Sequence, residues 1–298
     1  MSGNGLNYDA QLSIEWMQRC RPLFMLFIIA YALFVMNVPR IWKGRRSRVL
    51  AMIIFYWNAF NALADIILLL GLLPDFLTSF HEGFYSSLCL NAGLYKNPRS
   101  GKAILTFHIS KVWELLDTVL IILDGRKTNR LHVAHHIVIS TLMIYSYQHI
   151  GAMARWIAIT NLAAHAALYF YLAAQSCVWK RRTCSARVIS VIQMAQFPIC
   201  LFGLIKIRQF LNAKKKCETN YNGVSILIYS SFFLLFIRFY INKYGKDCTS
   251  REVFKSDLKG TQTYQISRKA PCQCSVIAGK KELKSFTEII LFVVTMTE

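Results

Sequence analysis

Long apolar blocks alternate with short polar loops along most of the chain. Each of the seven blocks is about 20 residues long, which matches the ~30 Å hydrocarbon core of a lipid bilayer. Backbone polar groups inside lipid must pair within their own segment, so each block is predicted to be a helix. The blocks cover residues 23–38, 49–73, 103–123, 131–147, 156–175, 188–210 and 224–241. The pattern therefore predicts an all-α polytopic membrane protein with seven transmembrane helices.

The same pattern divides the chain into three parts. Residues 1–22 precede the first span, residues 23–244 contain all seven spans, and residues 245–298 form a polar, lysine-rich tail. The first block follows Arg21 and Pro22 and has no small-residue cleavage site, so we expect a retained span rather than a removed signal peptide. The tail is too polar to build a core of its own and is predicted to be mobile.

Composition and charge narrow the possible classes. Of 298 residues, 55% are hydrophobic and 17% are charged, which excludes an ordinary globular protein, disorder, collagen and a disulfide-stapled miniprotein. Most of the 35 Lys+Arg follow the first, third, fifth and seventh spans, so these loops are predicted to face the cytosol. The N-terminus is then lumenal and the C-terminus cytosolic. The basic excess is expected to contact anionic lipid headgroups, and nucleic acid is not an expected partner.

The predicted topology also brings two cysteines to the same side of the membrane. The nine cysteines include no CxxC motif, and the tail residues Cys272 and Cys274 supply too few ligands for a zinc site. Cys89 and Cys217 fall in two different loops that both face the lumen. A disulfide could form between them in an oxidising compartment, although the sequence does not show whether they are close.

Charged residues occur inside the predicted third span, where a membrane helix tolerates them only if they face protein or water. An arc of roughly 120° on one helix face carries a base, two acids and a hydroxyl, which are Lys111, Glu114, Asp117 and Thr118. Two interpretations are open here: a structural ion-pair stripe between helices, or part of an active site. On the second span, Asn58, Asn61 and Asp65 recur at helical spacing, and hydrogen bonding between helices is the favoured interpretation.

Polar residues also recur on the next three spans. A single histidine in such a helix is more often a hydrogen-bonded core residue than a catalyst, but four histidines beside an acidic stripe favour an active site. The fourth span contains His132, His135 and His136 within an arc of about 100°. The candidates on the fifth and sixth spans are Asn161, His165, Tyr169, Tyr171, Gln193 and Gln196.

Two other classes explain less of this pattern. A di-iron membrane desaturase uses more histidines in several boxes, whereas the whole chain has seven. No metal or other cofactor is therefore expected, and the imidazoles are candidate general bases or nucleophiles. A rhodopsin-like receptor needs an acidic-arginine pair after its third span and an NPxxY motif in its seventh. At those places this chain has Leu123-Asp124-Gly125 and Arg238-Phe239-Tyr240.

Together these residues resemble the ELO-type very-long-chain fatty acid elongases, the 3-ketoacyl-CoA synthases of the endoplasmic reticulum. Four motifs of that family occur in order between about residues 20 and 245. They are KxxExxDT from Lys111 to Thr118, HxxHH from His132 to His136, NxxxHxxxYxY from Asn161 to Tyr171, and QxxQF from Gln193 to Phe197. Any one motif is weak, but the four together are highly specific.

The resemblance implies a helical barrel of spans two to seven around a narrow acyl tunnel, with the first span outside. It also implies a condensing enzyme of the endoplasmic reticulum membrane, which joins a long-chain acyl-CoA and malonyl-CoA to give 3-ketoacyl-CoA, CO2 and CoA. That reaction needs no cofactor. The expected partners are the lipid bilayer, the reductases and dehydratase of the elongation cycle, and a second copy of the chain in a homodimer.

The same resemblance implies roles for the motif residues. His135 is expected to be acylated, and His165 to orient or stabilise the acyl-histidine. The other catalytic candidates, whose acids and imidazoles would tune protonation, are Lys111, Glu114, Asp117, His132 and His136. The side chains expected to bind substrate are Thr118, Asn161, Tyr169, Tyr171, Gln193 and Gln196. Contacts to the CoA phosphates are expected from Arg126, Lys127, Arg130, Lys180, Arg181 and Arg182, although the cytosolic charge bias accounts for these cations equally well.

The chain departs from the family pattern at several positions. Leu172 stands where a second tyrosine usually follows Tyr171, Ala134 stands where the histidine box is usually aromatic, and Ser190 replaces a threonine. The chain ends in Thr-Met-Thr-Glu298 instead of a dilysine retrieval signal. An inactive relative or a scaffold of the elongation complex is therefore the main alternative. The motif sequences look more like the branch that acts on saturated and monounsaturated acyl-CoAs.

Overall fold

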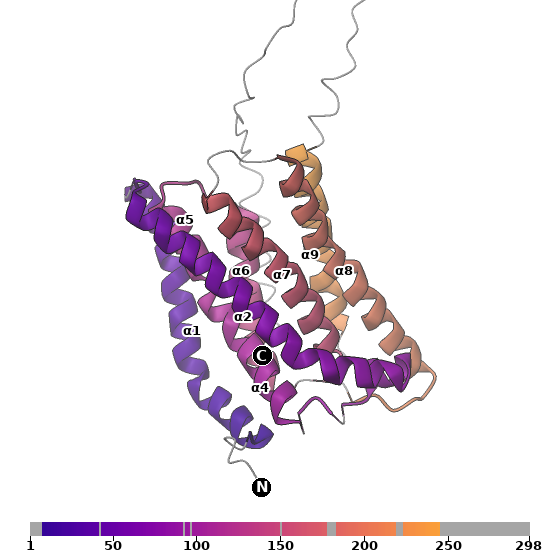
Figure 1. Ribbon diagram of the computed structural model, residues 1–298. Coiled ribbons are helices and arrows are strands. Elements are labelled where there is room, and N and C mark those ends of the chain that lie inside the picture. Colours follow the sequence, from indigo (N-terminus) through magenta and orange to yellow (C-terminus); the bar gives the residue numbers. More distant parts are fainter. Residues whose placement is uncertain are drawn as a thin grey trace, which may run out of the picture. The chain divides into compact units, whose positions relative to one another are not determined.

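The computed structural model describes residues 8–41, 43–91, 93–95, 97–149, 151–177, 183–218 and 223–244. Every regular element in these ranges is helical, which confirms the predicted all-α class. The elements (Figure 1) are α1 (Ala10–Ile41), α2 (Arg48–His81), α3 (Phe84–Cys89), α4 (Pro98–Trp113), α5 (Leu116–Leu123), α6 (Arg130–Ser146), η1 (Tyr147–His149), α7 (Ala154–Cys177), α8 (Thr183–Asn212) and α9 (Gly223–Tyr244). Residues up to Tyr240 form one compact unit, and the predicted tail lies outside the described residues.

Five helices are long and apolar enough to cross a membrane, namely α1, α2, α7, α8 and α9. They contain the first, second, fifth, sixth and seventh predicted spans, so the chain is a multi-span membrane protein. The third predicted span corresponds to two helices, α4 and α5. The fourth corresponds to α6, which has 17 residues. α4 has 16 residues and α5 has 8, so each of these three helices is shorter than the roughly 20 residues of an ordinary span. Five spans are thus supported by length and composition, and the count of seven stays a prediction.

The third predicted span is wrong as a single helix, because a turn separates α4 from α5 at its most polar point. In a continuous helix the Lys111 carbonyl would accept the N–H of Leu115. That N–H bonds the Val112 carbonyl instead, at 3.3 Å, in the tighter pattern of a 3₁₀ turn. The freed Lys111 carbonyl accepts the hydroxyl of Ser140 from α6. A side chain inserted into the helical hydrogen-bond ladder therefore interrupts the span.

Asparagine caps determine where two of the central helices begin. Asn129 Oδ1 accepts the N–H of Leu131 at 3.1 Å at the start of α6, and Asn97 caps α4 in the same way. Pro98 follows Asn97 at the first helical position, where its missing N–H leaves no bond unmade. The cap on α6 places the histidine motif in the first turns of that helix.

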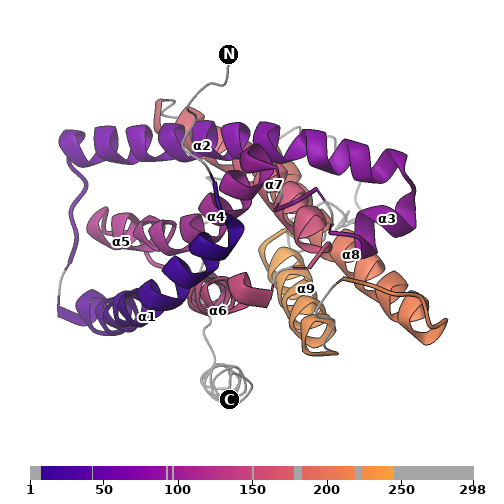
Figure 2. The same ribbon diagram turned by 90° about the horizontal axis from the view of Figure 1, so that it is seen from below.

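Six helical segments follow one another around a ring, and α1 packs outside it (Figure 2). α2 contacts both α4 and α7, α4 contacts α6, and α7 contacts α8. Aromatic rings on α9 complete the ring: the centroid of Phe232 lies 5.1 Å from that of His135 on α6, and the centroid of Phe236 lies 5.3 Å from that of Phe197 on α8. α1 contacts α4, α5 and α6.

A disulfide joins Cys89, at the end of α3, to Cys217, in the loop after α8, a pairing that the sequence had left open. Backbone hydrogen bonds reinforce this connection. The N–H of Glu218 bonds the Cys89 carbonyl at 2.7 Å, and the N–H of Ala152 bonds the Glu218 carbonyl at 3.2 Å. The loop after α8 is therefore attached both to α3 and to the segment that precedes α7.

A buried ion pair lies next to the disulfide. Arg155 donates to the carbonyl of Leu90, the residue after Cys89, at 3.0 Å. The Arg155 side chain is 1% exposed, and its Nε lies 3.0 Å from Oδ2 of Asp75 on α2. Removing either partner would leave a charge buried and uncompensated, so the pair attaches α7 firmly to α2 at this end of the unit.

We expect Cys217→Ser to lower the Tm of the purified protein in detergent. The bridge joins cysteines 128 residues apart, and a disulfide that closes such a long loop stabilises by about 2–5 kcal/mol. Cys20→Ser, which removes a free cysteine of α1, should leave the Tm unchanged. Thermal unfolding followed by scanning fluorimetry measures both, and an unchanged Tm for Cys217→Ser would contradict a stabilising bridge.

Candidate active site

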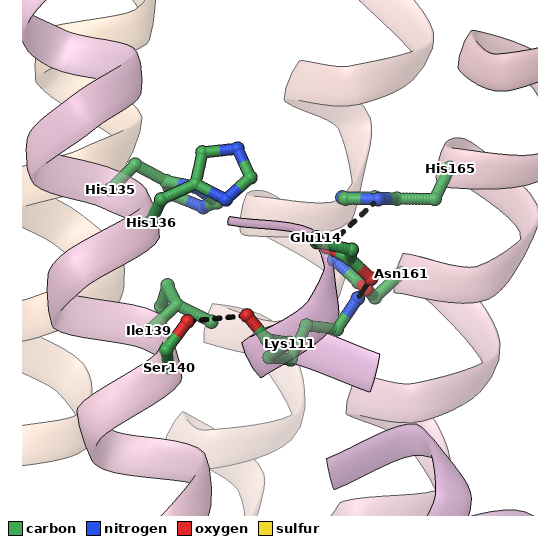
Figure 3. A pocket seen from close by; sticks show the side chains of 8 residues that line it. All are labelled: Lys111, Glu114, His135, His136, Ile139, Ser140, Asn161 and His165. Carbon is green, nitrogen blue, oxygen red and sulfur yellow. Dashed lines mark hydrogen bonds and ion pairs between the residues drawn. The ribbon is translucent and has the colours of Figure 1, made fainter. Parts of the chain in front are cut away.

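Polar side chains from α4, α6, α7 and the turn after α4 converge on an internal cavity (Figure 3). The cavity is lined by Lys111, Glu114, His135, His136, Ile139, Ser140, Asn161 and His165. Figure 3 shows the two α6 imidazoles, His135 and His136, on one side and the His165 imidazole of α7 on the other. Residues of three motifs that are far apart in the chain therefore meet at one cavity.

An ion pair lies at the base of this cavity. Lys111 Nζ is 2.6 Å from Oε1 of Glu114, and both side chains are 3% exposed. Ser110 Oγ donates to the same oxygen at 3.3 Å. The second oxygen, Oε2, lies 3.6 Å from Nδ1 of His165. Glu114 thus connects the lysine of α4 with the imidazole of α7, so this ion pair belongs to the cavity and is more than a stripe between helices.

Asp117 and Thr118, the other two residues of the predicted polar face, make different contacts. The turn after α4 separates them from Lys111 and Glu114. Asp117 accepts a hydrogen bond from Trp57 Nε1 of α2 and another from the Tyr169 hydroxyl of α7, both at 2.6 Å. Thr118 is fully buried and accepts the hydroxyl of Tyr31 from α1 at 2.8 Å. Neither Asp117 nor Thr118 is among the residues that line the cavity. The four residues predicted to share one helix face therefore divide into two pairs, Lys111 with Glu114 and Asp117 with Thr118.

The histidines of α6 lie close together. The ring centroids of His132 and His136 are 4.2 Å apart, and those of His135 and His136 are 5.9 Å apart. His135 meets the edges or faces of two α9 rings, Phe232 and Phe236, at 5.1 and 5.7 Å. These aromatic contacts cover one side of the imidazole with apolar surface while the ring lines the cavity.

The amide side chains connect α7 with α8. Asn161 Nδ2 donates to Oε1 of Gln196 at 2.9 Å, and Gln193 Nε2 donates to the Ala164 carbonyl at 2.6 Å. Asn161 lines the cavity, whereas Gln193 and Gln196 are not among its lining residues. Tyr171 is partly buried on α7 and is not among the lining residues.

The basic residues predicted to bind CoA phosphates are in different situations. Arg126 Nε is 2.7 Å from Oδ2 of Asp124, so this guanidinium already has a carboxylate partner. Lys127 and Arg130 are exposed between α5 and the start of α6. The second group, Lys180, Arg181 and Arg182, lies outside the described residues.

Sequence reasoning missed several residues that hold the site together. Trp57, Tyr31 and Ser140 carry hydrogen bonds to the charged motif, but each resembles an ordinary residue of an apolar helix in sequence. Asn61 makes the predicted bond between helices, accepting Trp113 Nε1 at 3.1 Å. Asn58 donates to the Ile54 carbonyl of its own helix at 2.6 Å, and its bond to another helix stays a prediction.

The ring of apolar helices around a buried acid–base cluster defines a multi-span membrane protein with an internal polar site. Within the described ranges, no three His, Cys, Asp or Glu side chains are placed so that they could hold a metal ion. Residues 16–252 match the ELO (GNS1/SUR4) family. The chain belongs to this family, which confirms the resemblance that its four motifs carry.

Known relatives extend over most of the chain. Putative fatty acid elongase 3 of Caenorhabditis elegans is 25% identical over 284 residues, which are 94% of this chain and 86% of the relative. Long chain fatty acid elongase 2 of the same species is 28% identical over 77% of this chain and 86% of its own length. Very long chain fatty acid elongase 6 of Gallus gallus is 28% identical over 83% and 94%.

Two tyrosine substitutions compare the hydrogen bonds that Asp117 and Thr118 accept. Tyr169→Phe removes a donor to a carboxylate, whereas Tyr31→Phe removes a donor to a neutral hydroxyl. Hydrogen bonds to charged groups are worth about 1.5–3 kcal/mol, against about 0.5–1.5 kcal/mol for neutral ones. We therefore expect Tyr169→Phe to lower the Tm in detergent more than Tyr31→Phe does. Equal losses would show that Asp117 does not depend on the Tyr169 hydroxyl.

Proposed function

We propose that this chain is the condensing enzyme of fatty acid elongation, a very-long-chain 3-oxoacyl-CoA synthase. Its family and its relatives place it in fatty acid elongation. One observation carries the more specific proposal: His135, His136 and His165 share a cavity with the Lys111–Glu114 pair. Imidazoles beside a buried acid and base are suited to nucleophilic and general acid–base chemistry on a thioester.

In the first step, His135 attacks the thioester carbonyl of the acyl-CoA. A carbon–nitrogen bond forms, the carbon–sulfur bond breaks, and CoA leaves as a thiolate that takes up a proton. His135 suits this role because its ring lines the cavity and is covered on one side by Phe232 and Phe236. His165, held 3.6 Å from Glu114, is suited to hold or transfer a proton across the cavity.

In the second step, malonyl-CoA loses CO2 and its α-carbon becomes an enolate nucleophile. This carbon attacks the acyl-histidine carbonyl, a carbon–carbon bond forms, and the imidazole of His135 leaves. The product is 3-ketoacyl-CoA, two carbons longer than the acyl substrate. Lys111 and Asn161 line the cavity and are placed to stabilise the oxyanions that form on the acyl carbonyl and the enolate.

The ring of six helical segments suggests where the acyl chain is held. Its inner side is the proposed acyl tunnel, entered from the cytosol, with Lys127 and Arg130 available to the CoA phosphates at the start of α6. The proposed location is the endoplasmic reticulum membrane, with a lumenal N-terminus and the reductases and dehydratase of the cycle as partners. Saturated and monounsaturated acyl-CoAs are the proposed substrates, and a homodimer the proposed assembly.

Condensing activity is tested in membranes from cells that express the chain, given labelled malonyl-CoA and a series of acyl-CoAs without NADPH. Labelled 3-ketoacyl product is expected from the unaltered protein. His135→Ala should lower the rate by more than about 100-fold, since it removes the nucleophile.

His81→Ala is the matched control, because this histidine is exposed at the end of α2. It should retain the full rate. Full activity of His135→Ala would reject the acyl-histidine, and no product from correctly folded, unaltered protein would instead indicate an inactive relative or a scaffold.

A further inference from the structure

Trp57 is a residue of α2 to which neither the sequence motifs nor the proposed reaction gives a role. Its side chain is partly buried, and its indole Nε1 donates to Oδ1 of Asp117 at 2.6 Å. A hydrogen bond to a carboxylate is shorter and stronger than one between neutral groups, because the acceptor carries a charge. This bond therefore fixes the Asp117 carboxylate of α5 relative to α2.

Asp117 extends this constraint to α7. Its second oxygen, Oδ2, accepts the Tyr169 hydroxyl at 2.6 Å, so the two bonds occupy different oxygens of one carboxylate. Tyr169 is 1% exposed and is not among the residues that line the cavity. Trp57 and Asp117 together therefore determine where the Tyr169 side chain lies.

The Tyr169 ring packs against the imidazole that faces the cavity from α7. The ring centroids of Tyr169 and His165 are 5.8 Å apart, with an angle of 62° between the rings. Edge-to-face contacts of this kind favour a defined orientation of the two rings. Among the described residues, Nδ1 of His165 has no hydrogen-bond partner, and it lies 3.6 Å from Oε2 of Glu114 (Figure 3). The position of this imidazole therefore depends on the ring that packs against it.

These contacts form a closed loop with the turn after α4. The N–H of Asp117 bonds the Glu114 carbonyl at 3.0 Å, and the Glu114 side chain lies beside His165. Asp117 contacts Tyr169 through its side chain, and the Tyr169 ring contacts His165. Trp57 connects this loop to α2, so a change at Trp57 affects the cavity although Trp57 does not line it.

We propose that Trp57 is a positioning residue for the condensation, which acts through Asp117 and the Tyr169 ring to hold the His165 imidazole beside Glu114. This inference rests on the proposed function, in which His165 holds or transfers a proton. For that step the imidazole must stay at a fixed place in the cavity, opposite His135 (Figure 3). A displacement of about 1 Å by a mutation far from the chemistry can lower a rate about 100-fold.

Trp57→Phe tests this role, because it retains an aromatic ring and removes the donor to Asp117. We expect kcat to fall by about tenfold, since His165 is then held less precisely. KM for acyl-CoA should stay unchanged, because neither Trp57 nor Tyr169 lines the cavity. Initial rates of labelled 3-ketoacyl-CoA formation by purified protein, over a range of acyl-CoA concentrations, separate the two constants. A raised KM with an unchanged kcat would contradict a positioning role.

Trp156→Phe is the matched control, with the same chemical change on α7. Trp156 Nε1 donates to the Ser87 hydroxyl at 3.3 Å, and Trp156 is not among the residues that line the cavity. This variant should keep the kcat of the unaltered protein. If both tryptophan variants lower kcat equally, the loss comes from weaker packing between helices, and the proposal is overturned.

A double-mutant cycle tests the route through Tyr169. Tyr169→Phe removes the hydroxyl that bonds Asp117, so it should by itself lower kcat and leave KM unchanged. Adding Trp57→Phe should then cause no further loss, because residues that act through one network have non-additive effects. Losses of kcat that multiply would show that Trp57 acts by another route.

The single variant Tyr169→Phe keeps the proposal testable if Trp57→Phe does not fold. The constraint from Trp57 reaches His165 only through the Tyr169 hydroxyl in this proposal. An unchanged kcat for Tyr169→Phe, or a raised KM in its place, would therefore overturn it, and a lower kcat with an unchanged KM would support it.

The two proposals fail differently. An unaltered protein without condensing activity would overturn the proposed function and with it the positioning role of Trp57. An active unaltered protein together with an equally active Trp57→Phe variant would overturn this inference and leave the proposed function intact.

Discussion

A lysine–glutamate pair buried among apolar helices is the constraint on which the rest of this structure depends. Lys111 and Glu114 are almost completely removed from solvent, and a charge in such a place is stable only with a partner and further hydrogen bonds. Two neighbouring helices contribute polar groups here: Ser140 of α6 donates to the Lys111 backbone carbonyl, and His165 of α7 lies 3.6 Å from Glu114. The polar centre and the packing of the helices therefore require each other.

The interruption between α4 and α5 shows how the chain accommodates this centre. A regular helix would keep its carbonyls occupied and would hold Lys111, Glu114 and Asp117 on one face. Because Ser140 takes the Lys111 carbonyl, the backbone turns at Glu114, and the acids separate. The Glu114 side chain then lines the cavity, while Asp117 accepts hydrogen bonds that connect α5 to α2 and α7. One local irregularity thus gives two acids of the same motif two different functions.

Helical periodicity predicted contacts within one helix well and contacts between helices poorly. The spacing of His132, His135 and His136 placed them on one face, and their rings do lie together. It did not show that Phe232 and Phe236 of α9 would cover His135. An apolar aromatic residue in a membrane helix has the same appearance in sequence whether it faces lipid or an imidazole, so no local signal distinguishes the two.

The sequence by itself determined the helical class, the family and the motif residues of the cavity, because hydrophobic length and short-range spacing act within a few helical turns. Only the tertiary structure decided that Cys89 meets Cys217, that the third span is interrupted at Glu114, and that Trp57 binds Asp117. These features join residues that are distant in the chain. Their contacts are set by how whole helices pack against one another, and that arrangement depends on all of their side chains at once.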